Sequence, residues 1–166
     1  FSLRPILSGE LGMTAQLLLM GALLIGFGIK IPLFPFHTWL PDAHTEASTP
    51  VSVLLAGVLL KLGTYGLLRF CLGLFPDAWQ VAAPWLAGWA AISVLYGSLA
   101  AIAQTDMKRM VAYSSVGHMG YVLLAAAAAT PLGLMGALFQ MVSHGLISGV
   151  LFLVVGVVYA QTGTHH

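Results

Sequence analysis

The chain has 166 residues, of which 59% are hydrophobic and only 7% are Asp, Glu, Lys or Arg, and its formal net charge is +1. A soluble domain carries about 25% charged residues, so this chain has too few polar side chains for a surface in water, and we expect an integral membrane protein. Its few basic residues are scattered, which argues against a nucleic-acid partner, and its one cysteine, Cys71, allows neither an intrachain disulfide nor a thiolate metal site.

The first predicted membrane span has no charged residue over residues 11–29, and its apolar run continues past Lys30 to about Trp39. A helix needs roughly 20 apolar residues to cross the hydrocarbon core. Pro32 and Pro35 lie inside this run, and each removes a backbone N–H and disfavours helix at the preceding residue. We therefore expect this span to be broken at the two prolines, as in transporters that use interrupted helices to solvate ions.

The second span is predicted to begin with Thr49 as a cap and Pro50 in the first helical position, and to end near Arg69. A third span is predicted over about residues 83–104. Indole side chains favour the membrane–water interface, and we expect to find there the three tryptophans at one end of this span. These are Trp79, Trp85 and Trp89.

Two more spans complete the predicted fold. A polar turn from Gln104 to Arg109 precedes a fourth span at about residues 107–129. Thr130 and the proline after it repeat the cap-then-proline start for a fifth span within residues 131–160. The sequence therefore predicts an all-α polytopic membrane protein with about five transmembrane helices.

Three ionisable residues are predicted to share one depth in the membrane. Lys61, His118 and His144 lie 11, 12 and 13 residues after the starts of their spans. At about 1.5 Å per residue this is roughly 17–20 Å along each helix, near the middle of a core about 30 Å thick. Charge is costly there, so such residues normally face protein or a water-filled path. With Lys30 beside the proline break, they indicate a route for protons or cations.

Lysine and histidine suit proton transfer in an apolar medium. A buried ammonium group is easier to deprotonate than one in water, and an imidazole can take a proton at one nitrogen and release it from the other. We therefore predict a relay formed by Lys30, Lys61, His118 and His144. Hydroxyl groups could hold water between them, namely those of Ser98, Ser114, Ser115, Ser143, Ser148, Thr64, Tyr65 and Tyr113. The alternative is that the two histidines only form hydrogen bonds between helices.

A second polar group consists of His37, Asp42, His44 and Glu46. These side chains are of metal-binding types, but their spacing matches no metal signature. Pro41 places them at a helix end or in a loop. We therefore expect a hydrogen-bonded loop at the membrane interface rather than a metal site.

Long stretches of the chain resemble the antiporter-like membrane subunits of respiratory complex I. The similar residues are 36–44 (FHTWLPDAH), 49–52 (TPVS), 55–63 (LAGVLLKLG), 103–120 (AQTDMKRMVAYSSVGHMG) and 141–145 (MVSHG). The residues just before and at Lys61 favour the subunit M type, which is chain 4 in photosynthetic versions. The resemblance covers nearly the whole chain.

This resemblance implies a subunit of fourteen helices in two inverted repeats, of which residues 1–166 would be one transmembrane piece, helices 7 to 11. Lys30 would lie on the discontinuous helix 7 and Lys61 on helix 8, while His118 and His144 would be relay histidines of helices 10 and 11. The loops nearby would face the cytoplasm or stroma, with the charged residues Asp42, Glu46, Lys108 and Arg109.

The resemblance also implies an activity, proton translocation by a quinone oxidoreductase complex fed by NADH or ferredoxin. The membrane would be the bacterial inner membrane or the thylakoid rather than the mitochondrial one, and the partners would be lipid and other membrane subunits. We expect no cofactor in the chain, since one cysteine cannot hold an iron–sulfur cluster. The family's helix-5 glutamate and helix-12 lysine are not among these residues, so the piece alone should not pump.

Two other functions fit the same residues. One is a subunit of a multisubunit cation/proton antiporter, which would have no redox partner and whose transport could depend on sodium. The other is a non-conducting membrane scaffold, in which the buried lysines and histidines would be dispensable.

Overall fold

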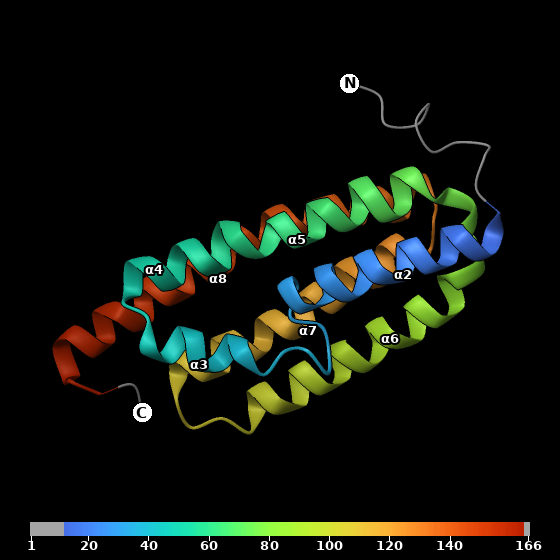
Figure 1. The fold of residues 1–166 in the computed structure, drawn as a ribbon. Coiled ribbons are helices and arrows are strands. Elements are labelled where there is room, and N and C mark those ends of the chain that lie inside the picture. Colours follow the sequence, from blue (N-terminus) through green and yellow to red (C-terminus); the bar gives the residue numbers. More distant parts are fainter. Residues whose placement is uncertain (1–11, 165–166) are drawn as a thin grey trace.

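The computed structural model describes residues 12–164, and in that part of the chain it contains helices and no strands. Five rods in the described residues are long and apolar enough to cross a membrane, which confirms the predicted all-α polytopic fold (Figure 1). They are α2 (Met13–Lys30), a rod from α4 to η2 (Thr49–Leu72), α6 (Pro76–Ile102), α7 (Met107–Ala127) and α8 (Pro131–Thr162).

The proline-rich segment separates α2 from a short helix, α3 (Trp39–Glu46). Residues 31–38 are not helical, and the first candidate span ends at Lys30 instead of continuing to Trp39. Helix α6 binds the backbone of this segment, because Phe34 N–H donates to Ser93 Oγ at 3.1 Å and Trp89 Nε1 donates to the Phe34 carbonyl. Non-helical backbone at membrane depth is tolerated when protein satisfies its polar groups in this way.

The second rod contains two π-helical stretches. It consists of α4 (Thr49–Leu54), η1 (Leu55–Leu59), α5 (Leu60–Gly66) and η2 (Leu67–Leu72). A π-helical turn has i→i+5 hydrogen bonds in place of the i→i+4 bonds of an α-helix, and such turns are frequent at functional sites. The predicted cap at Thr49 is wrong, since Ser48 is the N-cap residue and makes no side-chain cap hydrogen bond.

The third span starts earlier than predicted, at Pro76, and runs through Pro84. A proline can remain inside a membrane helix when neighbouring groups take up the freed carbonyl. Of the three tryptophans expected at the membrane–water interface, one faces outward and two pack inside the bundle. Trp79 is fully buried and donates to the Ala126 carbonyl at 3.0 Å, and the half-buried Trp89 points into the bundle, so only Trp85, 82% exposed, faces outward.

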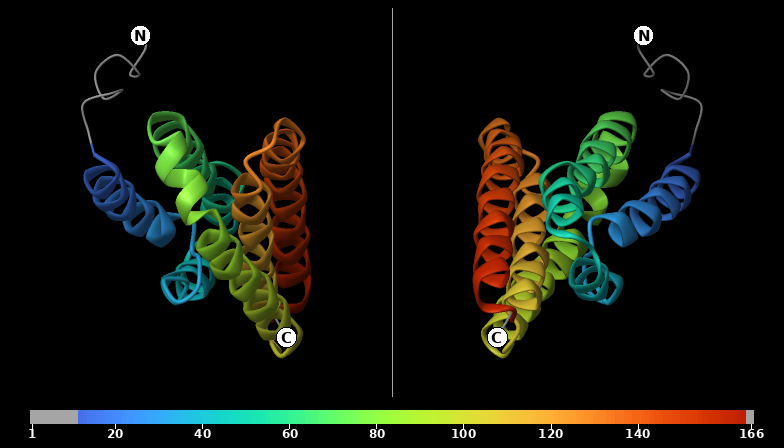
Figure 2. Two further views of the ribbon diagram at one scale, coloured as in Figure 1. Left: turned by 90° about the vertical axis from the view of Figure 1, so that its right-hand side faces the viewer. Right: turned by 90° about the vertical axis from the view of Figure 1, so that its left-hand side faces the viewer.

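Helices α7 and α8 begin as predicted from their cap residues. Asp106 Oδ1 accepts from Arg109 N–H at 3.1 Å, and Thr130 Oγ1 accepts from Gly133 N–H at 3.0 Å. In Figure 1 the ends of α3 and α8 and the starts of α4 and α7 lie at one end of the bundle. The views of Figure 2 place α2 and α8 on opposite sides of it.

Helices α6 and α7 pack almost backbone to backbone. A Cβ atom at Gly97 would lie 2.5 Å from Gly117 N, so only glycine fits at this crossing. Outward faces of the bundle carry large exposed apolar side chains such as Leu18 and Leu132, which suits contact with lipid. The main core is centred on α6 and α7, and a smaller buried cluster surrounds Phe152 of α8.

Candidate functional site

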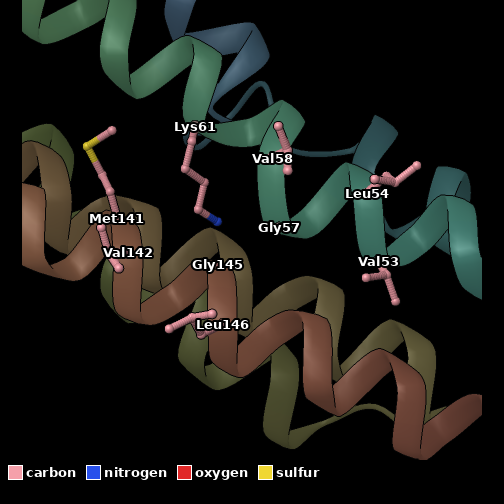
Figure 3. A pocket seen from close by; sticks show the side chains of 9 residues that line it. All are labelled: Val53, Leu54, Gly57, Val58, Lys61, Met141, Val142, Gly145 and Leu146. Carbon is pink, nitrogen blue, oxygen red and sulfur yellow. The ribbon is translucent and has the colours of Figure 1, made fainter.

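The side chain of Lys61 crosses from the second rod to α8 (Figure 3). Its Nζ lies 2.5 Å from Nδ1 of His144 and donates to the carbonyl oxygen of Ala56 at 2.6 Å. Ala56 belongs to the π-helical stretch η1, and its carbonyl oxygen, which has two lone pairs, can accept from the ammonium. A lysine nitrogen in an otherwise apolar rod thus has two polar partners, which lowers the cost of burying it.

The imidazole of His144 joins Lys61 to a third helix. Its Nε2 lies 3.0 Å from Ser115 Oγ of α7, and that hydroxyl donates to the Val111 carbonyl at 3.2 Å. One assignment of hydrogens satisfies every contact: the ammonium donates to Nδ1, Nε2–H donates to the serine, and the serine donates to the carbonyl. The ring therefore has a proton donor on one side and a proton acceptor on the other.

Two glycines allow the rod and α8 to approach closely at this point. A Cβ atom on Gly145 would lie 3.0 Å from the Gly57 carbonyl oxygen and 3.6 Å from Lys61 Cε. Lys61 also lines an open, largely apolar groove of about 500 Å³ between the same two elements. In Figure 3 its nitrogen reaches across this groove toward α8 at the level of Gly145.

His118 completes a group of three of the four predicted relay residues. Its ring centroid lies 5.3 Å from that of His144, and the residue is otherwise exposed. Its Nδ1 lies 3.0 Å from Nε2 of Gln140, one turn before His144 on α8. These contacts bring the three residues together at one level of the bundle. Gln140 was not predicted, although a lone amide in an apolar span is a signal of the same kind.

Lys30 does not join this group. Its Cγ would lie 3.1 Å from a Cβ atom at Gly63, two residues after Lys61. Positions two apart on an α-helix are separated by about 200°, so Lys30 and His144 contact opposite faces of α5. Lys30 is half-buried, lines a second groove of about 360 Å³ beside Phe27, and makes no side-chain hydrogen bond to any residue of the described part.

Of the hydroxyl groups predicted to hold water, three contact the pair. Besides Ser115, the buried Ser148 donates from its Oγ to the His144 carbonyl at 2.5 Å, and Thr64 Oγ1 donates to the Lys61 carbonyl at 3.0 Å. Ser114 binds the Val111 carbonyl of its own helix instead.

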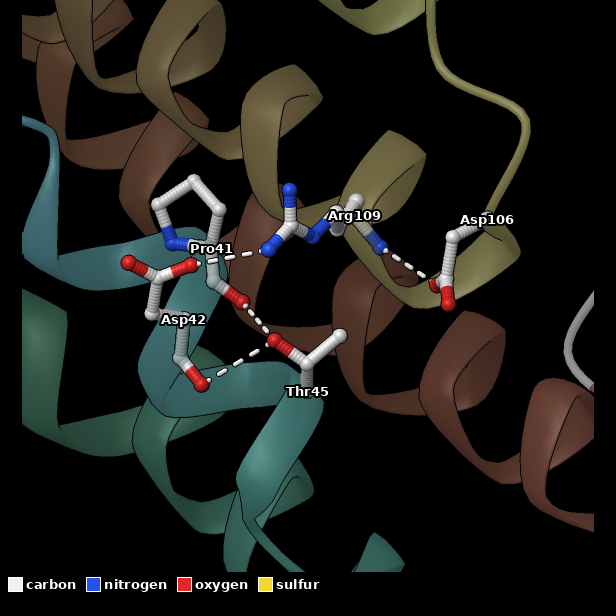
Figure 4. Close-up of polar contacts among 5 residues, drawn as sticks. All are labelled: Pro41, Asp42, Thr45, Asp106 and Arg109. Carbon is white, nitrogen blue, oxygen red and sulfur yellow. Dashed lines mark hydrogen bonds and ion pairs between the residues drawn. The ribbon is translucent and has the colours of Figure 1, made fainter.

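Two cationic side chains at the start of α7 bind α3, and Figure 4 shows the one of Arg109. Arg109 Nη2 lies 3.0 Å from Asp42 Oδ1, and Lys108 Nζ donates to the Ala47 carbonyl at 2.9 Å. The ion pair is largely exposed, so it contributes about 1 kcal/mol at most. These residues share one end of the bundle, and the exposed Glu46 ends α3 there.

The expectation of a hydrogen-bonded interfacial loop is wrong for His37 and His44, because both are buried. His44 lies within α3 and stacks on Phe152, and burial together with the positive charge of Lys108 lowers its pKa to about 4. His37 lies among aromatic rings, and burial lowers its pKa. Their ring nitrogens Nδ1 of His37 and Nδ1 and Nε2 of His44 have no hydrogen-bond partner among residues 12–164.

Over residues 2–166 the chain matches the family described as NADH:quinone oxidoreductase/Mrp antiporter, TM. It is 56% identical over 149 residues to NAD(P)H-quinone oxidoreductase chain 4 1 of Synechococcus sp. (strain JA-3-3Ab), covering 90% of this chain and 28% of the relative. It is 52% identical over 164 residues to NAD(P)H-quinone oxidoreductase chain 4 3 of Picosynechococcus sp. (strain ATCC 27264 / PCC 7002 / PR-6). This match covers 99% of this chain and 30% of the relative. The chain thus spans under a third of the length of these relatives.

Solved structures with the same fold come from several membrane complexes. Respiratory complex I from Thermus thermophilus with bound NADH contains a chain that matches with a TM-score of 0.90 and 36% identity, covering 100% of this chain and 36% of that one. A chain of the Mrp complex from Dietzia sp. DQ12-45-1b matches with a TM-score of 0.82 and 26% identity. This match covers 86% of this chain and 27% of that one.

Proposed function

Because the chain belongs to the NADH:quinone oxidoreductase/Mrp antiporter family of transmembrane proteins, we propose that it forms the centre of a proton path in a membrane subunit of a quinone oxidoreductase complex. The observation that carries the proposal is the contact between Lys61 Nζ and His144 Nδ1 at 2.5 Å, deep within two apolar rods. Proton relays in membranes place ionisable groups at such positions.

The contact geometry supports one elementary step. A proton leaves Lys61 Nζ for Nδ1 of His144, and the ring releases the proton that it held on Nε2 toward Ser115 or water beside it. Lys61 is then neutral and ready to accept the next proton. His118, with its ring beside that of His144, extends the path along the same level.

In this proposal Lys30 is the proton-carrying residue on the face of α5 opposite His144. It lies beside the non-helical segment 31–38 and lines a groove through which water could reach its ammonium. Partner subunits of the parent complex would drive transfer by changing the local field or the access of water around these lysines. The chain itself carries no redox chemistry in this proposal.

A second candidate function, cation/proton exchange without a redox partner, is favoured by the structural similarity to the Mrp complex chain. The quinone oxidoreductase function is preferred because the two relatives described above, named NAD(P)H-quinone oxidoreductase chain 4, are 56% and 52% identical to this chain, against 26% for the Mrp chain.

An ion-dependence measurement separates the two functions. In proteoliposomes holding the parent complex, we expect proton uptake to require an electron donor and a quinone and to proceed equally in sodium-free and sodium buffer. Proton movement that needs a sodium gradient and ignores the electron donor would favour the antiporter. A membrane scaffold predicts no uptake that depends on the buried lysines.

A further inference from the structure

A second buried histidine lies on the same side of the second rod as the Lys61–His144 pair. His44 of α3 is 0% exposed and stacks on Phe152 of α8, with ring centroids 4.4 Å apart and planes within 17°. Neither of its ring nitrogens has a hydrogen-bond partner among the residues that the structure describes. The backbone of His44 is held, since Ser52 Oγ donates to its carbonyl at 3.3 Å.

Packing alone does not explain a histidine here. The surroundings include the small apolar cluster of Ala56, Val111, Phe152 and Val155, in which a phenylalanine ring would stack without losing polar contacts. Buried polar atoms in native proteins nearly always have a partner, and internal water is the usual one when protein supplies none. The two nitrogens therefore point to water beside the ring.

Helix α8 connects this ring to the Lys61–His144 pair. His144, Ser148 and Phe152 follow each other at intervals of four residues and so lie on one face of the helix. At about 1.5 Å per residue, Phe152 is about 12 Å from His144 along the axis, toward the end at which Asp42 and Arg109 form their ion pair. Ser148, 2% exposed, provides a hydroxyl between the two.

We propose that His44 is a further proton-carrying residue, which takes protons from water near the Asp42–Arg109 ion pair and passes them by way of water at Ser148 to His144. This proposal rests on the proposed function of the Lys61–His144 pair. In each passage a proton binds one ring nitrogen of His44 while the proton on the other nitrogen leaves, so the ring gains no lasting charge.

The charged groups near His44 fit a carrier that does not keep its proton. Lys108 of α7, whose Nζ binds the Ala47 carbonyl three residues beyond His44, places a positive charge nearby. Together with burial this lowers the pKa of His44 to about 4, so the ring rests in its neutral form with one N–H and one free lone pair. From α8 and α4 the neighbours Phe152 and Ser52 are uncharged.

The test is the initial rate of electron-driven proton uptake by the parent complex in proteoliposomes. His44→Phe keeps the ring and its stacking but removes both nitrogens, and we expect at least a tenfold lower rate in assembled complex. His37→Phe is the matched control, a buried histidine that stacks on Phe34 and meets Tyr96 edge-on rather than contacting α8, and we expect it to stay within twofold of wild type. Lys61→Met is measured in the same series.

The outcomes separate this proposal from the proposed function. Wild-type uptake in His44→Phe with collapsed uptake in Lys61→Met would overturn the role of His44 alone, whereas unchanged uptake in both would overturn the proton path itself. Equal losses of proton uptake in His44→Phe and His37→Phe would also overturn the role of His44, because they would indicate a general packing defect. Should His44→Phe fail to assemble, high-resolution density of the wild-type complex decides: ordered water within hydrogen-bond distance of a His44 ring nitrogen is expected, and a dry ring contradicts the proposal.

Discussion

At the residue scale, Lys61 retains an ammonium group inside an apolar rod because two other elements bind it. The π-helical stretch η1 offers the Ala56 carbonyl, and α8 offers Nδ1 of His144. The carbonyl can accept a hydrogen bond from the ammonium or from the neutral amine, and the imidazole can take the proton itself. The two partners therefore suit both protonation states of Lys61.

Ser115 orients the ring of His144, so its hydroxyl should matter more than that of its neighbour. Ser115→Ala removes the acceptor of Nε2–H, and we expect about a fivefold lower rate of proton uptake, the equivalent of one hydrogen bond of about 1 kcal/mol. Ser114→Ala is the control, since Ser114 Oγ binds only the Val111 carbonyl, and Ser115→Thr should restore the rate. Equal rates in the two alanine variants would remove Ser115 from the site.

Sequence reasoning found the depth of the ionisable residues but not all their partners. Spans starting at Asp106 and Thr130 fixed the level of His118 and His144, because cap residues mark the first turn. Which face of α5 each lysine meets depends on how helices pack, and a single sequence gives no such contact. This is why Lys30 was predicted to be part of one relay, whereas in the structure it lies across α5 from His144.

At the element scale, the spacing of α6 and α7 depends on Gly97. A Cβ there would meet backbone nitrogen of Gly117 at 2.5 Å, and backbone cannot turn aside as a flexible side chain can. We expect Gly97→Ala to destabilise the fold by about 1–3 kcal/mol, as overpacking does elsewhere. Thermal denaturation of the purified parent complex measures this.

Gly88→Ala provides the matched control on the same helix, since nothing lies within 4 Å of a Cβ at that position. We expect it to leave the melting temperature unchanged or slightly raised, because alanine favours helix over glycine. Equal melting temperatures for Gly97→Ala and Gly88→Ala would show that α6 and α7 can separate at no cost.

Element boundaries were predictable where local chemistry decides them. The proline pair predicted a break inside the first span, whereas the structure ends α2 at Lys30 and places residues 31–38 outside any helix, where Ser93 and Trp89 bind the backbone of Phe34. The start of α6 was predicted at about residue 83, whereas the helix begins at Pro76 and continues through Pro84. The π-helical stretches η1 and η2 have no sequence signal that local propensity could supply.

At the scale of the whole molecule, the second rod divides two polar regions. Lys30 and its groove lie on the face toward α2, and the group of Lys61, His118 and His144 lies on the face toward α8, on the opposite side of the bundle (Figure 2). A proton that moves along the level of these residues must therefore pass α5. Lys61 is the residue of α5 that carries an ionisable group toward α8, which makes it the central element of the proposed path.

The most direct measurement is proton uptake per electron in proteoliposomes holding the parent complex, compared between wild type and Lys61→Met. Leu62→Met is the control, since Leu62 is the next residue of α5 and is 56% exposed. We predict that Lys61→Met assembles but loses most proton uptake, whereas Leu62→Met retains the wild-type ratio. A wild-type ratio of protons to electrons in Lys61→Met would contradict the proposal that this lysine carries protons to His144.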